Sequence, residues 1–99
     1  QIMKYFIGNW KMFGVPKSIN IIKKINFFHL KDKNRKKYRV IITPPYTLIE
    51  TYARKFKGKK IFIGSQNCYQ KDQFSSITAA ISPYMIKSVG AKHCGARRV

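Results

Sequence analysis

Three short runs of apolar residues recur along the chain, at residues 5–7, 38–43 and 61–63. Each run is continuous and does not alternate with polar residues, which is typical of parallel strands covered on both faces. Stretches with helical periodicity separate the runs. We therefore predict three buried parallel strands with helices between them.

The first helical stretch has apolar residues at Ile21, Ile22, Ile25 and Phe28, with lysines between them. This spacing predicts one apolar helix face. Pro16 stands near the start of the stretch, where the missing backbone N–H of a proline costs least. The stretch should end before the basic segment 31–37, which we expect to be a solvated loop.

The second helical stretch has a cleaner stripe, and Gly58 follows it as a stop signal. Thr47 and Glu50 have the spacing of a capping box, in which a hydroxyl and a carboxylate each satisfy a free backbone N–H. We therefore predict that the helix begins at Thr47. The stripe consists of Leu48, Ile49, Tyr52, Ala53 and Phe56.

The third helix is short and has clear signals at both ends. Ser82 should cap its N-terminus, with Pro83 as its first residue. Ile81 and Ile86 stand where a hydrophobic staple would form. Gly90 should end the helix by adopting a left-handed conformation.

The order strand–helix, repeated three times, implies right-handed crossovers and a parallel sheet, and so an α/β fold. Two architectures share this order, a doubly wound sheet and a piece of a barrel, and periodicity does not separate them. A closed eight-fold barrel needs about 250 residues. With 99 residues the chain could form only part of such a barrel.

The charge is strongly positive, with 21 lysines and arginines against three acids and a formal net charge of +18. Alone this suggests an anionic partner, namely nucleic acid, an anionic membrane or a phosphorylated ligand. The basic residues are mostly lysines spread over expected helix faces and loops, so biased composition explains them as well. Non-specific, salt-sensitive binding to polyanions follows from either interpretation.

The remaining composition points to an ordinary globular protein of the cytoplasm. Cys68 and Cys94 lack disulfide-scaffold or zinc spacing, so we predict two unpaired thiols in a reducing compartment. No apolar run reaches the roughly 18 residues of a membrane span. The first run is too short for a signal peptide, and Met3 could be the natural start.

Candidate chemistry lies directly after the first predicted strand, in residues 8–12 (Gly-Asn-Trp-Lys-Met). Parallel α/β folds bind ligands at the carboxyl ends of their strands. There the Lys11 ammonium and the Asn9 amide could meet an anionic substrate that carries a carbonyl group. The alternative is a surface lysine beside a turn asparagine.

Four segments in order resemble the triosephosphate isomerase family. Residues 8–12 resemble its opening signature, and residues 43–46 (Thr-Pro-Pro-Tyr) resemble the turn after its second strand. Residues 64–69 resemble the segment that ends its third strand. Residues 81–87, followed by Gly90 and Ala91, resemble the short helix before its fourth strand. The resemblance spans nearly the whole chain.

This resemblance implies the N-terminal part of a (β/α)8 barrel, with three βα units, the start of a fourth strand and an atypical tail at 92–99. The family interconverts dihydroxyacetone phosphate and glyceraldehyde 3-phosphate in glycolysis and gluconeogenesis, uses no cofactor or metal, and forms homodimers. Lys11 would be catalytic and bind substrate, and Asn9 would help to position it. Thr78 would lie at the tip of the dimer-interface loop.

The chain also departs from the family pattern. The resemblance implies a histidine in a Gly-His-Ser-Glu segment and a distant glutamate, and neither occurs in these 99 residues. His93 comes too early to be that histidine, and His29 should be a surface or capping residue. Ala79 replaces the glycine expected after Thr78, which predicts backbone strain. We therefore expect the isolated chain to be inactive, as a truncated or frame-shifted reading of an isomerase.

The alternative from another class is a small basic protein that binds nucleic acid, since lysines and aromatics permit it. Against it, the aromatics fall mostly at expected core positions. No helix-turn-helix, RNP-like or zinc pattern accompanies them.

Overall fold

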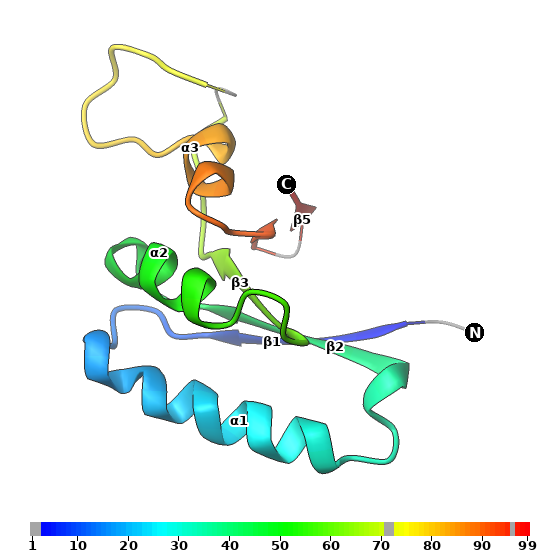
Figure 1. Ribbon diagram of the computed structural model, residues 1–99. Coiled ribbons are helices and arrows are strands. Elements are labelled where there is room, and N and C mark those ends of the chain that lie inside the picture. The colour runs from blue at the N-terminus through cyan, green and yellow to red at the C-terminus, as the bar shows by residue number, and fades with distance from the viewer. Residues whose placement is uncertain (1–2, 71–72, 96) are drawn as a thin grey trace.

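The computed structural model describes residues 3–70, 73–95 and 97–99. Strands and helices alternate along the chain, as predicted (Figure 1). The strands are β1 (Lys4–Asn9), β2 (Tyr38–Thr43), β3 (Ile61–Ser65), β4 (His93–Cys94) and β5 (Arg97–Arg98). The helices are α1 (Ile19–Lys31), α2 (Tyr46–Lys55) and α3 (Pro83–Ser88), with short 3-10 turns η1 (Pro16–Ser18) and η2 (Arg35–Lys37).

The strands form one sheet in the order β1-β2-β3-β4-β5. The first four strands are parallel, and β5 turns back antiparallel to β4. The rings of Tyr5 on β1 and His93 on β4 lie only 6.5 Å apart, although two strands separate them. A flat sheet would hold these strands about 14 Å apart, at about 4.8 Å per step. The sheet is therefore curled into part of a barrel, which decides between the two architectures.

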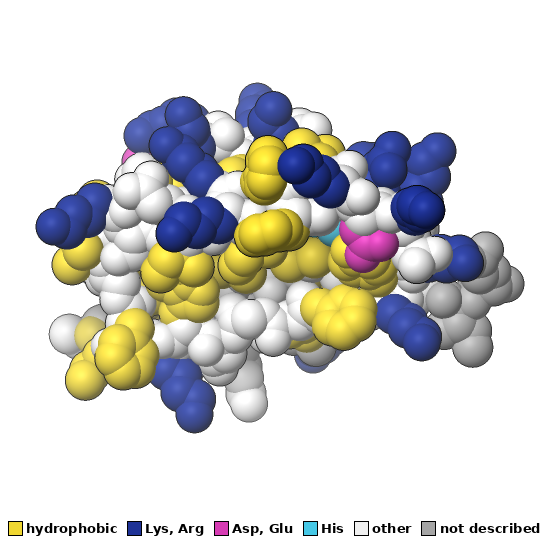
Figure 2. Space-filling view, turned by 90° about the horizontal axis from the view of Figure 1, so that it is seen from below, with side chains coloured by type: hydrophobic (Ala, Val, Ile, Leu, Met, Phe, Trp, Pro, Cys, Tyr) yellow, Lys and Arg dark blue, Asp and Glu magenta, His cyan; other side chains and the backbone are white. Residues whose placement is uncertain are grey.

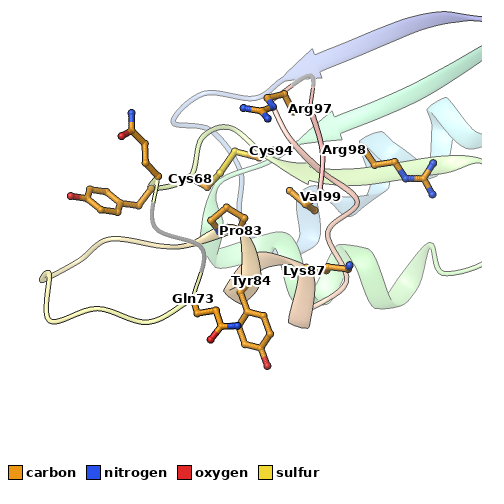
Figure 3. A pocket seen from close by; sticks show the side chains of 11 residues that line it. Cys68, Gln73, Pro83, Tyr84, Lys87, Cys94, Arg97, Arg98 and Val99 are labelled. Carbon is orange, nitrogen blue, oxygen red and sulfur yellow. A yellow bond between two sulfur atoms is a disulfide. The ribbon is translucent and has the colours of Figure 1, made fainter.

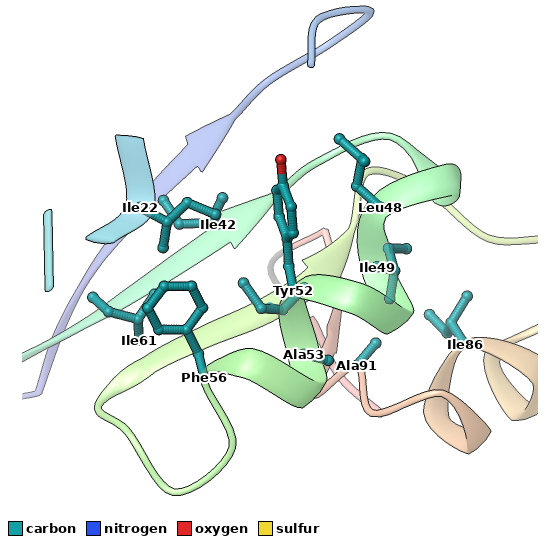
Figure 4. Close-up of a cluster of buried hydrophobic side chains, with 11 residues drawn as sticks. Ile22, Ile42, Leu48, Ile49, Tyr52, Ala53, Phe56, Ile61, Ile86 and Ala91 are labelled. Carbon is teal, nitrogen blue, oxygen red and sulfur yellow. The ribbon is translucent and has the colours of Figure 1, made fainter. Parts of the chain in front are cut away.

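One hydrophobic core lies between the helices and the outer face of the sheet (Figure 4). Tyr52 of α2 is fully buried near its centre, Ile22 joins it from α1 and Ile86 from α3. All three helices thus cover the same face of the curled sheet. The buried cluster comprises Ile22, Ile42, Leu48, Ile49, Tyr52, Ala53, Phe56, Ile61, Ile63, Ile86 and Ala91.

The predicted ends of α3 are confirmed. The Met85 N–H donates to Ser82 Oγ at 3.2 Å, so Ser82 is the N-cap. Gly90 has a φ of +104°, and its N–H donates to the Lys87 carbonyl at 3.0 Å. The next N–H, of Ala91, reaches the carbonyl of Ile86 at 3.1 Å. This pair of bonds closes the helix in a Schellman motif.

Replacing Gly90 with alanine should destabilise the fold by about 1–3 kcal/mol, because the new Cβ meets two obstacles. Its φ is positive, and the Cβ would lie 2.8 Å from the Cβ of Ala53. Gly58→Ala is the matched control, since Gly58 has a φ of +79° but no atom within 4 Å of the added carbon. Urea unfolding should show the larger loss for Gly90→Ala, and equal losses would contradict the steric argument.

The predicted capping box of the second helix is wrong. The helix begins at Tyr46, directly after Pro45, and no side chain caps it. The Leu48 N–H instead donates to the backbone carbonyl of Pro45 at 3.0 Å. Pro45 therefore occupies the N-cap position. Thr47 is the second residue of the helix, inside its first turn, and cannot act as the cap.

Two burial predictions also fail. His29 is not a surface residue, since only 4% of it is exposed and its ring packs edge-on against Tyr38. It follows Ile22 by seven residues, two helical turns, and so shares the buried face. Strand β1 is not covered on both faces, and its apolar residues 5–7 are between 42% and 58% exposed. Among the described strands it pairs only with β2, so it is an edge strand.

The prediction of two unpaired thiols is wrong as well. The Sγ atoms of Cys68 and Cys94 are joined in a disulfide, with the Cα atoms 6.2 Å apart. The crossover from β3 to β4 places Cys94 beside Ser65, three residues before Cys68. The 26-residue separation in sequence gives no hint of this proximity.

Basic side chains are spread over the surface. On the face seen in Figure 2, lysines and arginines surround a band of apolar side chains and do not gather into one patch. No helix in the described part of the chain is long and apolar enough to cross a membrane.

Candidate functional site

The carboxyl ends of β1, β2 and β3 meet at one edge of the sheet, as the predicted site requires. The registers place Asn9 beside Thr43 and Ile42 beside Ile63, so the three strands end together. A cavity of about 390 Å³ opens at this edge. Residues from all three strand-to-helix connections line it: Lys11, Met12, Pro44, Pro45, Tyr46, Gln66 and Asn67.

Lys11 lies in this cavity wall with an unusual backbone. Its φ is +53°, a left-handed conformation that costs a non-glycine residue about 1–2 kcal/mol. Two hydrogen bonds hold it: the Lys11 N–H donates to Asn9 Oδ1 at 2.8 Å, and Gln66 Nε2 donates to the Lys11 carbonyl at 2.6 Å. Strain of this kind persists only where the surroundings enforce it, and it gathers at functional sites.

Asn9 and Lys11 are thus brought together as the sequence predicted. Both side chains are exposed. The Asn9 side-chain oxygen is occupied by the Lys11 N–H, which leaves its amide NH₂ as the group free to donate to a ligand. The ammonium of Lys11 adds a positive charge at the same edge. The pair can therefore bind an anion and direct a hydrogen bond at a neighbouring oxygen.

Gln66 is a site residue that the sequence reasoning did not assign. Its Nε2 donates to the carbonyl of Thr43 at 3.1 Å as well as to Lys11, so one side chain joins the connections after β1, β2 and β3. The Trp10 N–H also donates to the Thr43 carbonyl, at 3.1 Å. The position of Gln66 directly after the third strand was the signal that could have identified it.

Tyr46 and Asn67 also line the cavity and contact each other. The Tyr46 hydroxyl donates to the Asn67 carbonyl at 2.8 Å and also contacts Asn67 Oδ1. Burial raises the pKa of Tyr46 above its usual value, so the hydroxyl keeps its proton at neutral pH. This contact joins the start of α2 to the segment that follows β3.

Thr78 lies apart from this cavity. It belongs to the connection between β3 and α3, which extends away from the sheet (Figure 1). The predicted strain beside it is confirmed, because Ala79 has a φ of +66°. Phe74 and Ile77 on the same connection are 75% and 43% exposed. The described chain therefore does not bring Thr78 to Asn9 and Lys11.

His93 lies on the inner face of the curled sheet and is not among the described residues that line the cavity at Lys11. It begins β4 opposite Gly64 and packs near the rings of Tyr5 and Phe62, at 6.5 Å and 6.2 Å between centroids. Burial, and to a smaller extent the charge of Arg98, lowers the pKa of His93 below its usual 6.5. The imidazole is therefore neutral at neutral pH.

The lowered pKa of His93 makes stability depend on pH in a defined window. The unfolded chain binds a proton more readily, so the stabilising contribution is full above about pH 6.5 and is lost as pH falls through the folded pKa. Urea unfolding should show stability that falls as the pH drops below about 6.5, the pKa of an unperturbed histidine. His93→Gln should flatten this slope, and an unchanged slope in that variant would assign the effect elsewhere.

No group of three His, Cys, Asp or Glu side chains in the described residues could hold a metal ion. Positive charge, amides and backbone carbonyls are what the cavity edge offers a ligand.

The fold, together with the polar groups at this edge, defines the structural class of the protein. A curled parallel sheet, with helices on its outer face and polar groups gathered at the strands' carboxyl ends, is part of an α/β barrel. The family model for triosephosphate isomerase matches residues 4–95. The chain belongs to the triosephosphate isomerase family, and its fold is the N-terminal part of that barrel.

Individual relatives agree with this assignment. The triosephosphate isomerase of Bartonella henselae is 33% identical over 93 residues, which cover 94% of this chain and 36% of the relative. That of Brucella abortus is 35% identical over 86 residues, covering 87% and 33%. The crystal structure of the Bartonella henselae enzyme superposes with a TM-score of 0.80 at 30% identity, over 93% of this chain and 36% of that one. The chain spans about a third of the length of these relatives.

Proposed function

We propose that this chain is the first third of an enzyme that interconverts dihydroxyacetone phosphate and glyceraldehyde 3-phosphate. The observation that carries the proposal is the strained backbone of Lys11, held at the carboxyl ends of the strands by Asn9 and Gln66. The relatives that share this segment are triosephosphate isomerases. The substrate would be a small phosphorylated triose, and no cofactor is needed for a proton transfer of this kind.

Lys11 and Asn9 have distinct roles in this reaction. Moving a proton from the carbon beside the carbonyl group places negative charge on an enediolate oxygen. The Lys11 ammonium, added to the charge that it offers the phosphate, stabilises this developing charge. The free amide NH₂ of Asn9 would donate to the substrate and hold it in place. These assignments make Lys11 a catalytic and substrate-binding residue and Asn9 a substrate-binding residue.

The chemistry also needs a neutral histidine and a glutamate that moves the proton. In the proposed enzyme, the histidine and the glutamate would come from the two thirds of the relatives' barrel to which this chain does not align. We do not assign this role to His93, because it begins β4, whereas the family resemblance places the histidine at the end of that strand. We therefore expect the 99-residue chain to show no turnover by itself.

We further propose a homodimer as the assembled form, working in the cytoplasm. The connection that carries Thr78 extends away from the sheet and exposes Phe74 and Ile77, which suits contact with a second subunit (Figure 1). Thr78 would then support the active site of that subunit. The relatives named above offer no support for the nucleic-acid alternative, and on the face shown in Figure 2 the lysines and arginines are scattered.

A chimera tests this function directly. Residues 4–91 of this chain would replace the aligned segment of Bartonella henselae triosephosphate isomerase, which supplies the rest of the barrel. We expect isomerase turnover from the chimera and none from the 99-residue chain, measured by a coupled assay. A folded chimera without turnover would contradict the proposed function. Robust turnover by the chain alone would contradict its inactivity.

A further inference from the structure

The disulfide between Cys68 and Cys94 ties the start of the connection from β3 to α3 to β4, the strand that follows α3. Cys68 follows β3 by three residues, and Cys94 ends β4. One residue further, the Tyr69 N–H donates to the Ile81 carbonyl at 2.6 Å. The hydrogen bond thus joins the two ends of the connection, and the disulfide ties its first end to β4. Figure 3 shows the disulfide. The disulfide is the covalent one of these two links, so its redox state decides whether the start of the connection is tethered to β4.

Both cysteines can be reached from solvent. Each is only partly buried, and both line a cavity of about 760 Å³ beside Pro83 and Tyr84. A reagent can therefore approach the sulfur atoms without unfolding the core. A disulfide that is sealed in the core would need such unfolding first.

The charge around the pair favours exchange chemistry. Lys87, Arg97 and Arg98 line the same cavity, and none of its lining residues that the structure describes is acidic. Positive charge stabilises a thiolate, the species that attacks a disulfide and that leaves when one is broken. The surroundings should thus speed both the opening and the re-forming of the bond.

We propose that Cys68 and Cys94 form a redox-responsive clasp that controls the order of the β3–α3 connection. In the opening step, a thiolate of a small dithiol attacks one sulfur and expels the other cysteine as a thiolate, which takes up a proton. The second thiol of the reagent, once deprotonated, displaces the first cysteine. The two cysteines are then reduced, and the dithiol has become a cyclic disulfide.

Opening the clasp has a physical consequence for the connection. The closed bond removes chain entropy that the open connection regains. Ala79 is held at a φ of +66°, a strained conformation that persists only while its surroundings enforce it. Reduction should therefore loosen the connection while the core around Tyr52 stays packed. The clasp thus acts on a segment that extends away from the sheet (Figure 1).

Thiol labelling tests whether the bond forms. The 99-residue chain would be equilibrated in air-saturated buffer, denatured in iodoacetamide and weighed by mass spectrometry, with and without dithiothreitol beforehand. We expect no label without reductant and two labels after it. Two labels without reductant would overturn the proposal.

Hydrogen exchange tests the control of the connection. After reduction, amides of residues 73–82 should exchange at least roughly tenfold faster, while amides of α1 should stay unchanged as the internal reference. Cys68→Ser, under oxidising conditions, should match the reduced wild type. If Cys68→Ser does not fold, the comparison of exchange rates between the oxidised and the reduced wild-type chain still tests the proposal. Equal exchange in both redox states, with the disulfide shown to form, would overturn the clasp.

Discussion

Replacing Tyr52 with alanine should lower the free energy of unfolding by about 3–5 kcal/mol, enough to unfold most of the chain. Tyr52 is fully buried where α2 packs on the sheet. Its ring stands edge-on to Trp10 at 5.7 Å, and its hydroxyl donates to the Val15 carbonyl at 2.9 Å. The truncation would leave a large cavity and an unpaired carbonyl in the same place.

Two further variants separate these contributions in urea unfolding. Tyr52→Phe keeps the ring and loses only the donor to Val15, and should cost about 1–2 kcal/mol. Tyr84→Ala is the exposed control, since Tyr84 is half exposed and touches chiefly the ring of Phe74. It should cost less than about 1 kcal/mol. A loss at Tyr84 as large as that at Tyr52 would show that burial does not set the effect.

Replacing Lys11 with methionine in the chimera should lower kcat/KM by at least about 10²–10³-fold. Methionine keeps most of the length of the side chain and removes the charge, so the developing negative charge loses its stabilising partner. The backbone bonds of Lys11 to Asn9 and Gln66 do not involve the side chain and should survive. Circular dichroism should therefore be unchanged while turnover falls.

Lys24→Met is the matched control, because Lys24 is an exposed lysine on α1 and takes no part in the cavity. It should leave kcat/KM within about twofold, since a surface charge far from the site is screened by salt. Lys11→Arg separates charge from geometry, because the larger planar guanidinium keeps the positive charge but changes the shape of the group. Full activity of the Lys11→Met chimera would show that Lys11 has no catalytic role.

The order of elements could be predicted from local patterns alone. Continuous apolar runs identified β2 and β3, and helical spacing identified α1 and α2. Ser82 and Gly90 marked the ends of α3, because capping depends on a few neighbouring backbone groups. The family was also visible, since segments such as residues 8–12 keep their order along the chain.

The candidate site was predicted only in part. The positions of Asn9 and Lys11 directly after a strand were enough to place them at the carboxyl edge of the sheet, where parallel α/β folds bind ligands. Gln66 was missed, because its contacts with Lys11 and Thr43 join residues up to 55 positions apart. The positive φ of Lys11 was not foreseen either, since such strain is enforced by its partners and not by its own preference.

By itself, the sequence determined the strand and helix order, the caps of α3 and the pair Asn9 and Lys11, because each depends on neighbours within a few residues. Only the tertiary structure decided that the sheet curls, that His29 is buried and that β1 is left exposed as an edge strand. It also decided that Cys68 and Cys94 meet, although 26 residues separate them. Such contacts arise because crossover connections bring segments that are distant in sequence to neighbouring strands. Local sequence patterns do not show which distant residues become neighbours in this way.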